Sequence, residues 1–415
     1  MNLKITINKI IGALVLWQFI SVGLMAVGTW PKEVAIVNAA LLAIFILAAS
    51  PFYSVLLTVL SIPFFVILPN PFVANLPMWR VLFAWLFVVW FVKMLISQRA
   101  WLLKVFALKR WTTNSPKVPM TGARFREIIM NAMARINTRL RPWDKVAVLF
   151  LLLAFCSLLI ARFPMHGLKQ ILFLVNIYLL YIVAVNVVTD ESKLKELIRY
   201  ARYSLMIIVG LGFLQYFSTL FSLPYYFWQY WATMVSSLYY GVPLGNVLAY
   251  SNSWFSASSG AQALRMFGVL PDTHAFGVMC IFLLAYLEPF GRGVRGKATL
   301  QSLGQKRYWL AAIFLAAFGV MASGTRGVWV SLLVPIAIAA FAYFRGFLKP
   351  YFKKMLIIYA AIIFLFIVSP LITQGLNVIR TYDTKDNFLN RAGSIYDLSE
   401  SSNVGRLEIW KSSVK

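Results

Sequence analysis

The sequence predicts an all-α polytopic membrane protein with about 11 transmembrane helices. Of its 415 residues, 61% are hydrophobic and only 13% are charged, whereas soluble globular domains carry about 25% charged residues. Apolar runs of at least about 17 residues, enough to cross the hydrocarbon core as helices, recur along the chain. Because these runs are continuous and do not alternate with polar residues, they do not indicate a β-barrel.

Proline and polar residues mark the turns between the predicted helices. Pro51 and Pro71 fall in two of the early turns. Lys4 and Lys9 precede the first apolar run, which is long enough to span the membrane and is interpreted as an uncleaved first helix. The predicted spans are 9–28, 34–50, 52–69, 78–97, 146–161, 169–189, 203–222, 273–290, 308–322, 328–344 and 355–372.

Lysine and arginine in the connecting segments predict the orientation. The segments 98–145, 291–307 and 345–354 are rich in both residues, and the count of helices puts all three on the side of the N-terminus. The positive-inside rule assigns that side to the cytoplasm. The N-terminus is therefore predicted to be cytoplasmic. This placement of charge matters more than the net charge of +26, which does not by itself indicate a nucleic-acid partner.

The chain divides into three predicted parts. Residues 1–97 hold the N-terminal transmembrane helices, and 98–145 form a basic cytoplasmic loop. Within that loop, apolar residues share one helical face and arginines cover much of the rest, which predicts an amphipathic helix on the inner leaflet, with a solvated connector as the alternative. Residues 146–415 form a second transmembrane region, with an outer loop at 223–272 and the start of a large outer loop at 373–415.

The outer loop is rich in aromatic residues and lacks charge. No charged residue occurs between Tyr203 and Leu264, and residues 223–264 are too polar and interrupted for one simple helix. Clustered tyrosine and tryptophan are typical of an interfacial belt. The alternative is a platform for sugar rings or a groove for a lipid chain.

A turn with an arginine stands between two apolar runs, Tyr308 to Ala322 and Val328 to Phe344. Its sequence is Ser323-Gly324-Thr325-Arg326-Gly327. The two glycines let the backbone fold closely around a ligand, and the rigid guanidinium fork suits phosphate. The alternative is a tight turn whose arginine snorkels to the membrane surface.

Two further arginines share the predicted outer side with Arg326. Arg265 lies shortly before Asp272 and Thr273, either of which can cap the helix that follows. The N-terminus of that helix is a natural anion site, and capping beside a surface arginine is the alternative. Arg406 lies in the predicted outer tail. Several arginines on one membrane face, with little opposing charge, suit a phosphate or pyrophosphate headgroup.

The sequence predicts neither a metal site nor a disulfide framework. Cys156 and Cys280 both lie within apolar runs. Asp272 is isolated, and Asp383 and Asp386 stand in a tail that is expected to be solvated.

Three segments on the predicted outer face resemble motifs of one family. Arg265–Gly277 is similar to an arginine–glycine motif followed by a helix, Ser323–Gly327 to a Ser-x-Thr/Ser-Arg-Gly turn, and Gly405–Trp410 to an Arg-x-x-x-Trp element. The family is the O-antigen ligase and O-antigen polymerase superfamily of bacterial membrane glycosyltransferases. The resemblance covers roughly residues 170–415, and the first part of the chain is similar in hydropathy alone.

The resemblance implies a GT-C-like helical bundle in the bacterial cytoplasmic (inner) membrane. It implies transfer of a glycan from a polyprenyl-pyrophosphate carrier, such as undecaprenyl pyrophosphate, to an acceptor hydroxyl on the outer face. The acceptor is a glycan, a lipid or a protein, and the reaction needs no metal and no cofactor. Membrane lipids are the remaining implied partners, and nucleic acid is not one.

The resemblance also implies roles for single residues. It makes Arg265, Arg326 and Arg406 contacts of the carrier pyrophosphate, and the turn residues Gly324, Thr325 and Gly327 their support.

The family's acceptor-activating base is a histidine in an outer loop that continues past the Arg-x-x-x-Trp element. This sequence ends at Lys415, and its two histidines, His166 and His274, do not lie in such a motif. We therefore expect the base to lie beyond Lys415 and the chain to be a fragment.

A transporter or flippase of lipid-linked or anionic solutes is the alternative function. It predicts repeated halves and ionisable residues at the bilayer midplane. No repeat is visible, and Arg80 and Lys93 lie near the two ends of the fourth apolar run, where they can snorkel. Ligase and polymerase differ in their acceptor, and the sequence offers no basis for choosing between them.

Overall fold

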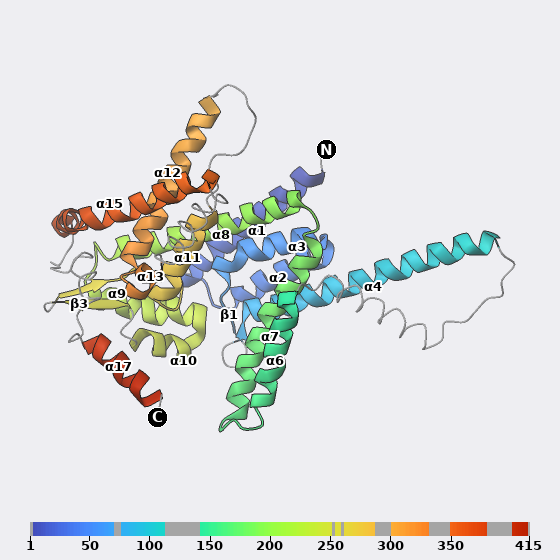
Figure 1. Ribbon diagram of the computed structural model, residues 1–415, viewed down its shortest axis with the longest axis horizontal. Coiled ribbons are helices and arrows are strands. Elements are labelled where there is room, and N and C mark those ends of the chain that lie inside the picture. The colour runs from blue at the N-terminus through green and yellow to red at the C-terminus, as the bar shows by residue number, and fades with distance from the viewer. Residues whose placement is uncertain are drawn as a thin grey trace. The chain divides into compact units, whose positions relative to one another are not determined.

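The computed structural model divides the chain into two compact units, which are described separately (Figure 1). Unit 1 comprises Met1–Met25 and Thr29–Tyr200, and unit 2 comprises Ala26–Gly28 and Ala201–Lys415. The structure describes residues 3–69, 76–112, 142–250, 254–258, 261–286, 300–331, 349–379 and 401–413.

The described part of unit 1 is mainly helical. Its elements are α1 (Leu3–Ala26), α2 (Val34–Ala48), α3 (Pro51–Ser61), the 3-10 turn η1 (Ile62–Phe64), β1 (Ile67–Leu68), β2 (Leu76–Pro77), α4 (Met78–Thr112), α6 (Pro142–Ser157), α7 (Pro164–Val187) and the start of α8 (Glu191–Ser218). Helix α4 packs against α2, α3 and α7, and α6 lies beside α7 (Figure 1). The two short strands pair antiparallel.

Buried polar side chains connect the first three helices of unit 1. The Trp17 indole donates to Asn38 Oδ1 (2.8 Å), and the Ser21 hydroxyl (3.1 Å) donates to the same oxygen. From α1, Gln18 Nε2 donates to Ser61 Oγ of α3 (3.1 Å). Because a bilayer core offers no water to such groups, these mutual bonds satisfy them and join α1 to α2 and α3.

The predicted span 52–69 is shorter as a helix than hydropathy indicates. Helix α3 ends at Ser61, a single 3-10 turn follows, and the chain is extended at Ile67–Leu68. Pro63 supplies the reason, because its ring clashes with the carbonyl four residues earlier and it has no N–H for the helical ladder. Hydropathy does not register this effect, because the apolar character continues past the proline.

Lys93 does not depend on water at the end of its span. Its ammonium donates to the carbonyl of Ala49 (2.6 Å) and to that of Ile46 (3.4 Å). These carbonyls belong to the C-terminal end of α2, where a cation is favourable. At the other end of the same span, the Arg80 guanidinium lies over the rings of Trp79 and Phe173. Both basic residues therefore have partners within unit 1.

Unit 2 places its helices around one apolar core. Its described elements are the rest of α8, α9 (Pro224–Tyr230), the π-helical segment η2 (Trp231–Ser236), α10 (Ser237–Tyr250), β3 (Phe255–Ser258), β4 (Ala261–Leu264), α11 (Thr273–Tyr286), α12 (Leu300–Ala322), α13 (Arg326–Ser331), α15 (Lys349–Ile379) and α17 (Ser401–Ser413). Strands β3 and β4 form an antiparallel hairpin, with Phe255 opposite Leu264. Helix α12 packs against α11, α13 and α15.

Two glycines let α11 pack closely against α12 and against the start of α13. A Cβ atom at Gly319 would lie 2.6 Å from the Cys280 sulfur, and one at Gly277 would lie 3.0 Å from the Val328 side chain. Such small residues allow close backbone contact between membrane helices. The start of α11 and the end of α12 are thereby held beside each other, and both predicted arginine motifs lie at these two ends.

Most of the predicted spans correspond to helices. Within the described residues, five helices are long and apolar enough to cross a membrane, namely Thr6–Ala26, Met78–Ser97, Pro164–Val187, Glu191–Ser218 and Ile357–Asn377. Four shorter apolar helices match further predicted spans: Val34–Ala48, Pro51–Phe64, Thr273–Leu284 and Leu310–Ala322. The all-α membrane class is consistent with these helices, whereas the number of spans and their orientation stay predictions.

The two long predicted loops differ from simple connectors where the structure describes them. In the basic loop 98–145, α4 continues to Thr112, while the predicted amphipathic helix lies outside the described residues. The predicted outer loop 223–272 contains α9, η2, α10 and the hairpin. A kink divides α10 at Gly241, which has a non-helical φ of 75°. Pro243 lies two residues further along the helix. This irregularity explains why the segment did not display the pattern of one helix.

Candidate functional site

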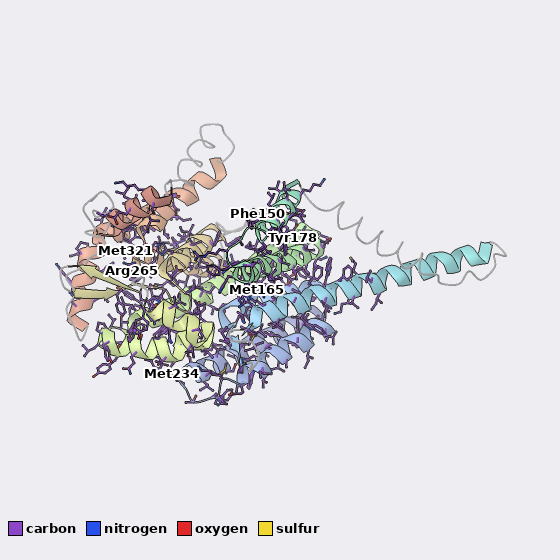
Figure 2. All side chains as sticks on the ribbon, turned by 90° about the horizontal axis from the view of Figure 1, so that it is seen from below. Phe150, Met165, Tyr178, Met234, Arg265 and Met321 are labelled. Atoms are coloured by element: carbon purple, nitrogen blue, oxygen red, sulfur yellow. The ribbon has the colours of Figure 1, made fainter. Side chains whose placement is uncertain are left out.

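Two of the sequence motifs lie against each other in unit 2. The Met266 N–H donates to the carbonyl of Ala322 at 2.9 Å. The Thr325 hydroxyl donates to Thr273 Oγ1 at 3.1 Å, and both threonines are buried. Figure 2 labels Arg265 and Met321, each of which neighbours one end of the backbone bond. The segment that carries Arg265 and the segment that carries Arg326 therefore form one structural group.

The turn that carries Arg265 follows directly from the hairpin. Strand β4 ends at Leu264, and the Arg265 N–H donates to the carbonyl of Trp254 at 2.8 Å. The Trp254 ring stacks on Phe267, with ring centroids 4.7 Å apart. Both aromatic side chains are fully buried. Arg265 itself is half-buried, so a rigid apolar base supports an arginine that reaches the edge of the core.

The same turn is held from α8. Gln215 Oε1 accepts hydrogen bonds from the N–H groups of Phe267 (3.1 Å) and Gly268 (2.9 Å). Gly268 has a φ of 57°, a left-handed conformation that favours glycine. Gln215 was not predicted as part of the site. The only sequence signal was a long polar side chain within an otherwise apolar run.

Asp272 caps the helix that follows this turn. Its Oδ1 accepts a hydrogen bond from the Ala275 N–H at 2.8 Å, which identifies Asp272 rather than Thr273 as the N-cap of α11. The exposed His274 lies nearby, with Nδ1 3.7 Å from Asp272 Oδ1. Desolvation raises the pKa of Tyr240 well above its usual value, and the charges of Tyr239 and Asp272 raise it further.

Tyr240 is therefore a neutral donor in this part of unit 2. Its hydroxyl donates to the carbonyl of Val269 at 2.6 Å. This bond ties α10 to the segment between Gly268 and Asp272. The turn is thus held from α8, α10 and α12, by Gln215, Tyr240 and Ala322 respectively.

The turn Ser323–Gly327 is tight and its arginine is buried. Gly324 has a φ of 61°, and its N–H donates to the carbonyl of Met321 at 3.0 Å as α12 ends. The N–H of Val328 then donates to the carbonyl of Thr325 at 3.0 Å as α13 begins. Arg326 is only 8% exposed. A guanidinium held this deep differs from one that snorkels into water, because its charge must be balanced by the surrounding groups.

Trp329 fixes this second turn from its far side. Its indole N–H donates to the carbonyl of Val320 at 2.9 Å, which joins α13 back to the last turn of α12. The Trp329 ring also packs edge-on against Phe366 of α15, with centroids 4.8 Å apart. Gly327 is exposed, and a Cβ atom there would meet open space. The left-handed backbone at position 324 explains why this residue is glycine. Steric crowding does not explain the glycine at position 327.

The structure does not test the placement of the third predicted arginine. Arg406 belongs to α17, and its side chain lies outside the described residues. Among the described residues, no group of three or more His, Cys, Asp or Glu side chains gathers as a possible metal site. The site therefore consists of Arg265 and Arg326 on two adjoining turns, with Thr273, Thr325 and Gln215 supporting them.

Comparison with known protein families gives a match for the part of the chain that contains the Arg326 turn. Residues 311–415 match the family model of the O-antigen ligase. The matched segment includes the Arg326 turn and Arg406, whereas Arg265 precedes it. No curated protein and no solved structure matches the chain. The match at residues 311–415 supports the assignment of this chain to the O-antigen ligase and O-antigen polymerase superfamily.

Proposed function

We propose that this protein transfers a glycan from a polyprenyl-pyrophosphate carrier to an acceptor hydroxyl on the outer face of the bacterial cytoplasmic membrane. The O-antigen ligase domain at residues 311–415 supports a role in glycan transfer. The observation that carries the proposal is the junction of the two turns, through Met266 and Ala322 and through Thr273 and Thr325. This junction brings two arginine-bearing segments together although they are distant in the sequence.

The chemistry requires stabilisation of a leaving anion. The bond between the sugar's anomeric carbon and the carrier phosphate oxygen breaks, and a bond forms between that carbon and the acceptor oxygen. The electron pair of the broken bond stays on the pyrophosphate, whose negative charge increases. Guanidinium groups that are already in place stabilise such charge with little reorganisation. Arg265 and Arg326 are assigned this role.

Arg326 is the better organised of the two for binding the anion. Its turn is fixed by Gly324, by the Thr325–Thr273 bond and by Trp329. Burial lowers the effective dielectric around its charge, which strengthens attraction to a phosphate. The proton of the acceptor hydroxyl passes to a general base, which we do not assign among the described residues. Arg406 is proposed as a third contact on the strength of its motif alone.

The test is glycan transfer in proteoliposomes that contain the purified full-length protein, with any sequence that follows Lys415 included, and a polyprenyl-pyrophosphate-linked glycan. We expect Arg326→Ala to lower transfer at least about 100-fold, the loss typical of a removed donor to a developing anion. Arg326→Lys is expected to recover little of it, because a lysine has no bidentate fork. Arg199→Ala, at an exposed arginine of α8, is the matched control and should transfer normally.

Two results would reject the proposal. One is transfer by Arg326→Ala at the rate of the Arg199→Ala control, with both proteins present at equal levels in the vesicles. The other is movement of the lipid-linked glycan across the vesicle membrane without any transfer, which would favour a transporter or flippase.

A further inference from the structure

Gln215 is a buried polar residue that neither the family match nor the arginine motifs assign. It lies on α8, only 1% exposed. Its Oε1 accepts two backbone hydrogen bonds from consecutive residues of the Arg265 turn, Phe267 at 3.1 Å and Gly268 at 2.9 Å. Two donors that converge on one oxygen fix which end of the amide faces the turn. The side chain therefore acts on the shape of the backbone that carries Arg265.

The close fit between α8 and the turn makes this contact hard to replace. A Cβ atom at Gly268 would lie 3.1 Å from the backbone of Gly212, which is one helical turn before Gln215 on α8. A Cβ atom at Gly212 would in turn overlap the ring of Phe276. Because glycine occupies both positions, the turn rests directly on the helix. Gln215 is the side chain of α8 that reaches the amide groups of this turn.

The choice of an amide rather than a carboxylate is informative. Within the described residues, the buried Nε2 of Gln215 has no hydrogen-bond partner. A glutamate of the same length would accept both backbone N–H groups and would leave no amide donor unsatisfied, so satisfaction of the turn does not explain the glutamine. A glutamate would, however, add a negative charge next to the N–H of Phe267, which is two residues after Arg265 in the turn.

We propose that Gln215 is a positioning residue that holds the Arg265 turn with a neutral acceptor, so that no carboxylate adds negative charge beside a turn that binds an anionic ligand. The ligand is the pyrophosphate of the lipid-linked donor, so this inference rests on the proposed function. A carboxylate at this position would place a negative charge against the turn that carries Arg265 and would disfavour binding of the pyrophosphate there. The amide supplies the same two hydrogen bonds without that charge.

Gln215→Glu separates charge from shape because it changes neither the length of the side chain nor its two accepted bonds. At a pH where the new carboxyl is neutral, we expect the KM for the lipid-linked donor to approach the wild-type value. As pH rises and the carboxyl ionises, we expect that KM to increase by about tenfold or more, because a negative charge then stands beside the turn that is proposed to bind the pyrophosphate. We expect kcat to change less than KM.

The pH dependence of KM is also measured for the wild-type protein, and the comparison corrects for the other groups that titrate. Those groups on the turn and on the nearby parts of the surrounding elements include Arg265, Asp272, His274, Tyr216, Tyr239, Tyr240, Cys280 and Arg326. Gln215→Leu is the companion variant, since it removes the accepted bonds without adding charge. It should lower kcat/KM at every pH, with no pH dependence beyond that of the wild type.

The outcomes distinguish this inference from the proposed function. If the wild-type protein transfers no glycan, the proposed function fails first. If the wild type is active and Gln215→Glu keeps a wild-type KM at every pH, the neutral-acceptor role is wrong. Binding of inorganic pyrophosphate to the detergent-solubilised protein gives a readout that does not depend on turnover, and Gln215→Glu should weaken it only when ionised. Equal binding by wild type and variant at high pH would also overturn the inference.

Discussion

One polar group of unit 1 and three polar side chains around the arginine turns of unit 2 bond to different kinds of partner. In unit 1, Trp17, Ser21 and Asn38 bond to one another, as do Gln18 and Ser61, so the bonds run from side chain to side chain between helices. In unit 2, Gln215, Tyr240 and Trp329 bond to backbone groups of the two arginine turns or of the helix end beside them.

The difference separates helix association from the shaping of a site. Bonds between side chains hold helices at a fixed distance but leave the backbone conformation to the helices themselves. Bonds from side chains to turn backbone determine where the next side chain points. Substitutions in the polar group of unit 1 should therefore change stability, whereas substitutions around the turns of unit 2 should change glycan transfer.

The largest effect in this comparison is expected at Gly268 of unit 2. Gly268→Ala places a Cβ atom 3.1 Å from the backbone of Gly212 and requires alanine at a φ of 57°. A left-handed alanine costs about 1–2 kcal/mol, and relief of the contact moves the Arg265 turn. We expect transfer in proteoliposomes to fall at least about tenfold, because small displacements of positioning groups are costly to the reaction.

Gly210→Ala is the matched control for this variant. It also adds one methyl group to a glycine of unit 2, on α8, but its Cβ atom meets open space. An equal loss of transfer in both variants would show that the backbone of the Gly268 turn has no special role.

A smaller effect, on stability and not on transfer, is expected at Asn38 of unit 1. Asn38→Ala removes the acceptor of Trp17 and the partner of Ser21. Hydrogen bonds between membrane helices contribute about 0.5–2 kcal/mol, so the unfolding midpoint in detergent should fall. Transfer per folded molecule should stay near that of the wild type. A large loss of transfer with unchanged stability would place the polar group of unit 1 in the reaction and end the distinction between the units.

Local sequence predicted the turn at Ser323–Gly327, because glycine residues between two apolar runs can be recognised from residue type, and Gly324 is left-handed there. The role of Arg326 in binding an anion stays a prediction. The depth of Arg326 was not predicted, since burial depends on tertiary packing such as that between α13 and α11, which are distant in the sequence. The bonds from Gln215 were not predicted for the same reason, because they join residues 52 and 53 positions apart.

Hydropathy predicted the presence of helices better than the residues at which they end. It located nearly all of the described apolar helices, but it extended the third one past Pro63, where the chain becomes strand-like. It also left 223–272 as a loop, because the kink at Gly241 and the π-helical segment Trp231–Ser236 interrupt any regular period. Such irregular helices are stabilised by tertiary packing, which a single sequence does not display.

Arg265 and Arg326 are proposed to act on one anion. A double-mutant cycle of Arg265→Ala and Arg326→Ala, with transfer measured at low donor concentration, tests it most directly. If both arginines hold the same pyrophosphate, the double variant should lose little more activity than the more damaging single variant, because residues that act as a unit are strongly non-additive. If the two losses multiply instead, the arginines act independently and the claim of one shared anion site is contradicted.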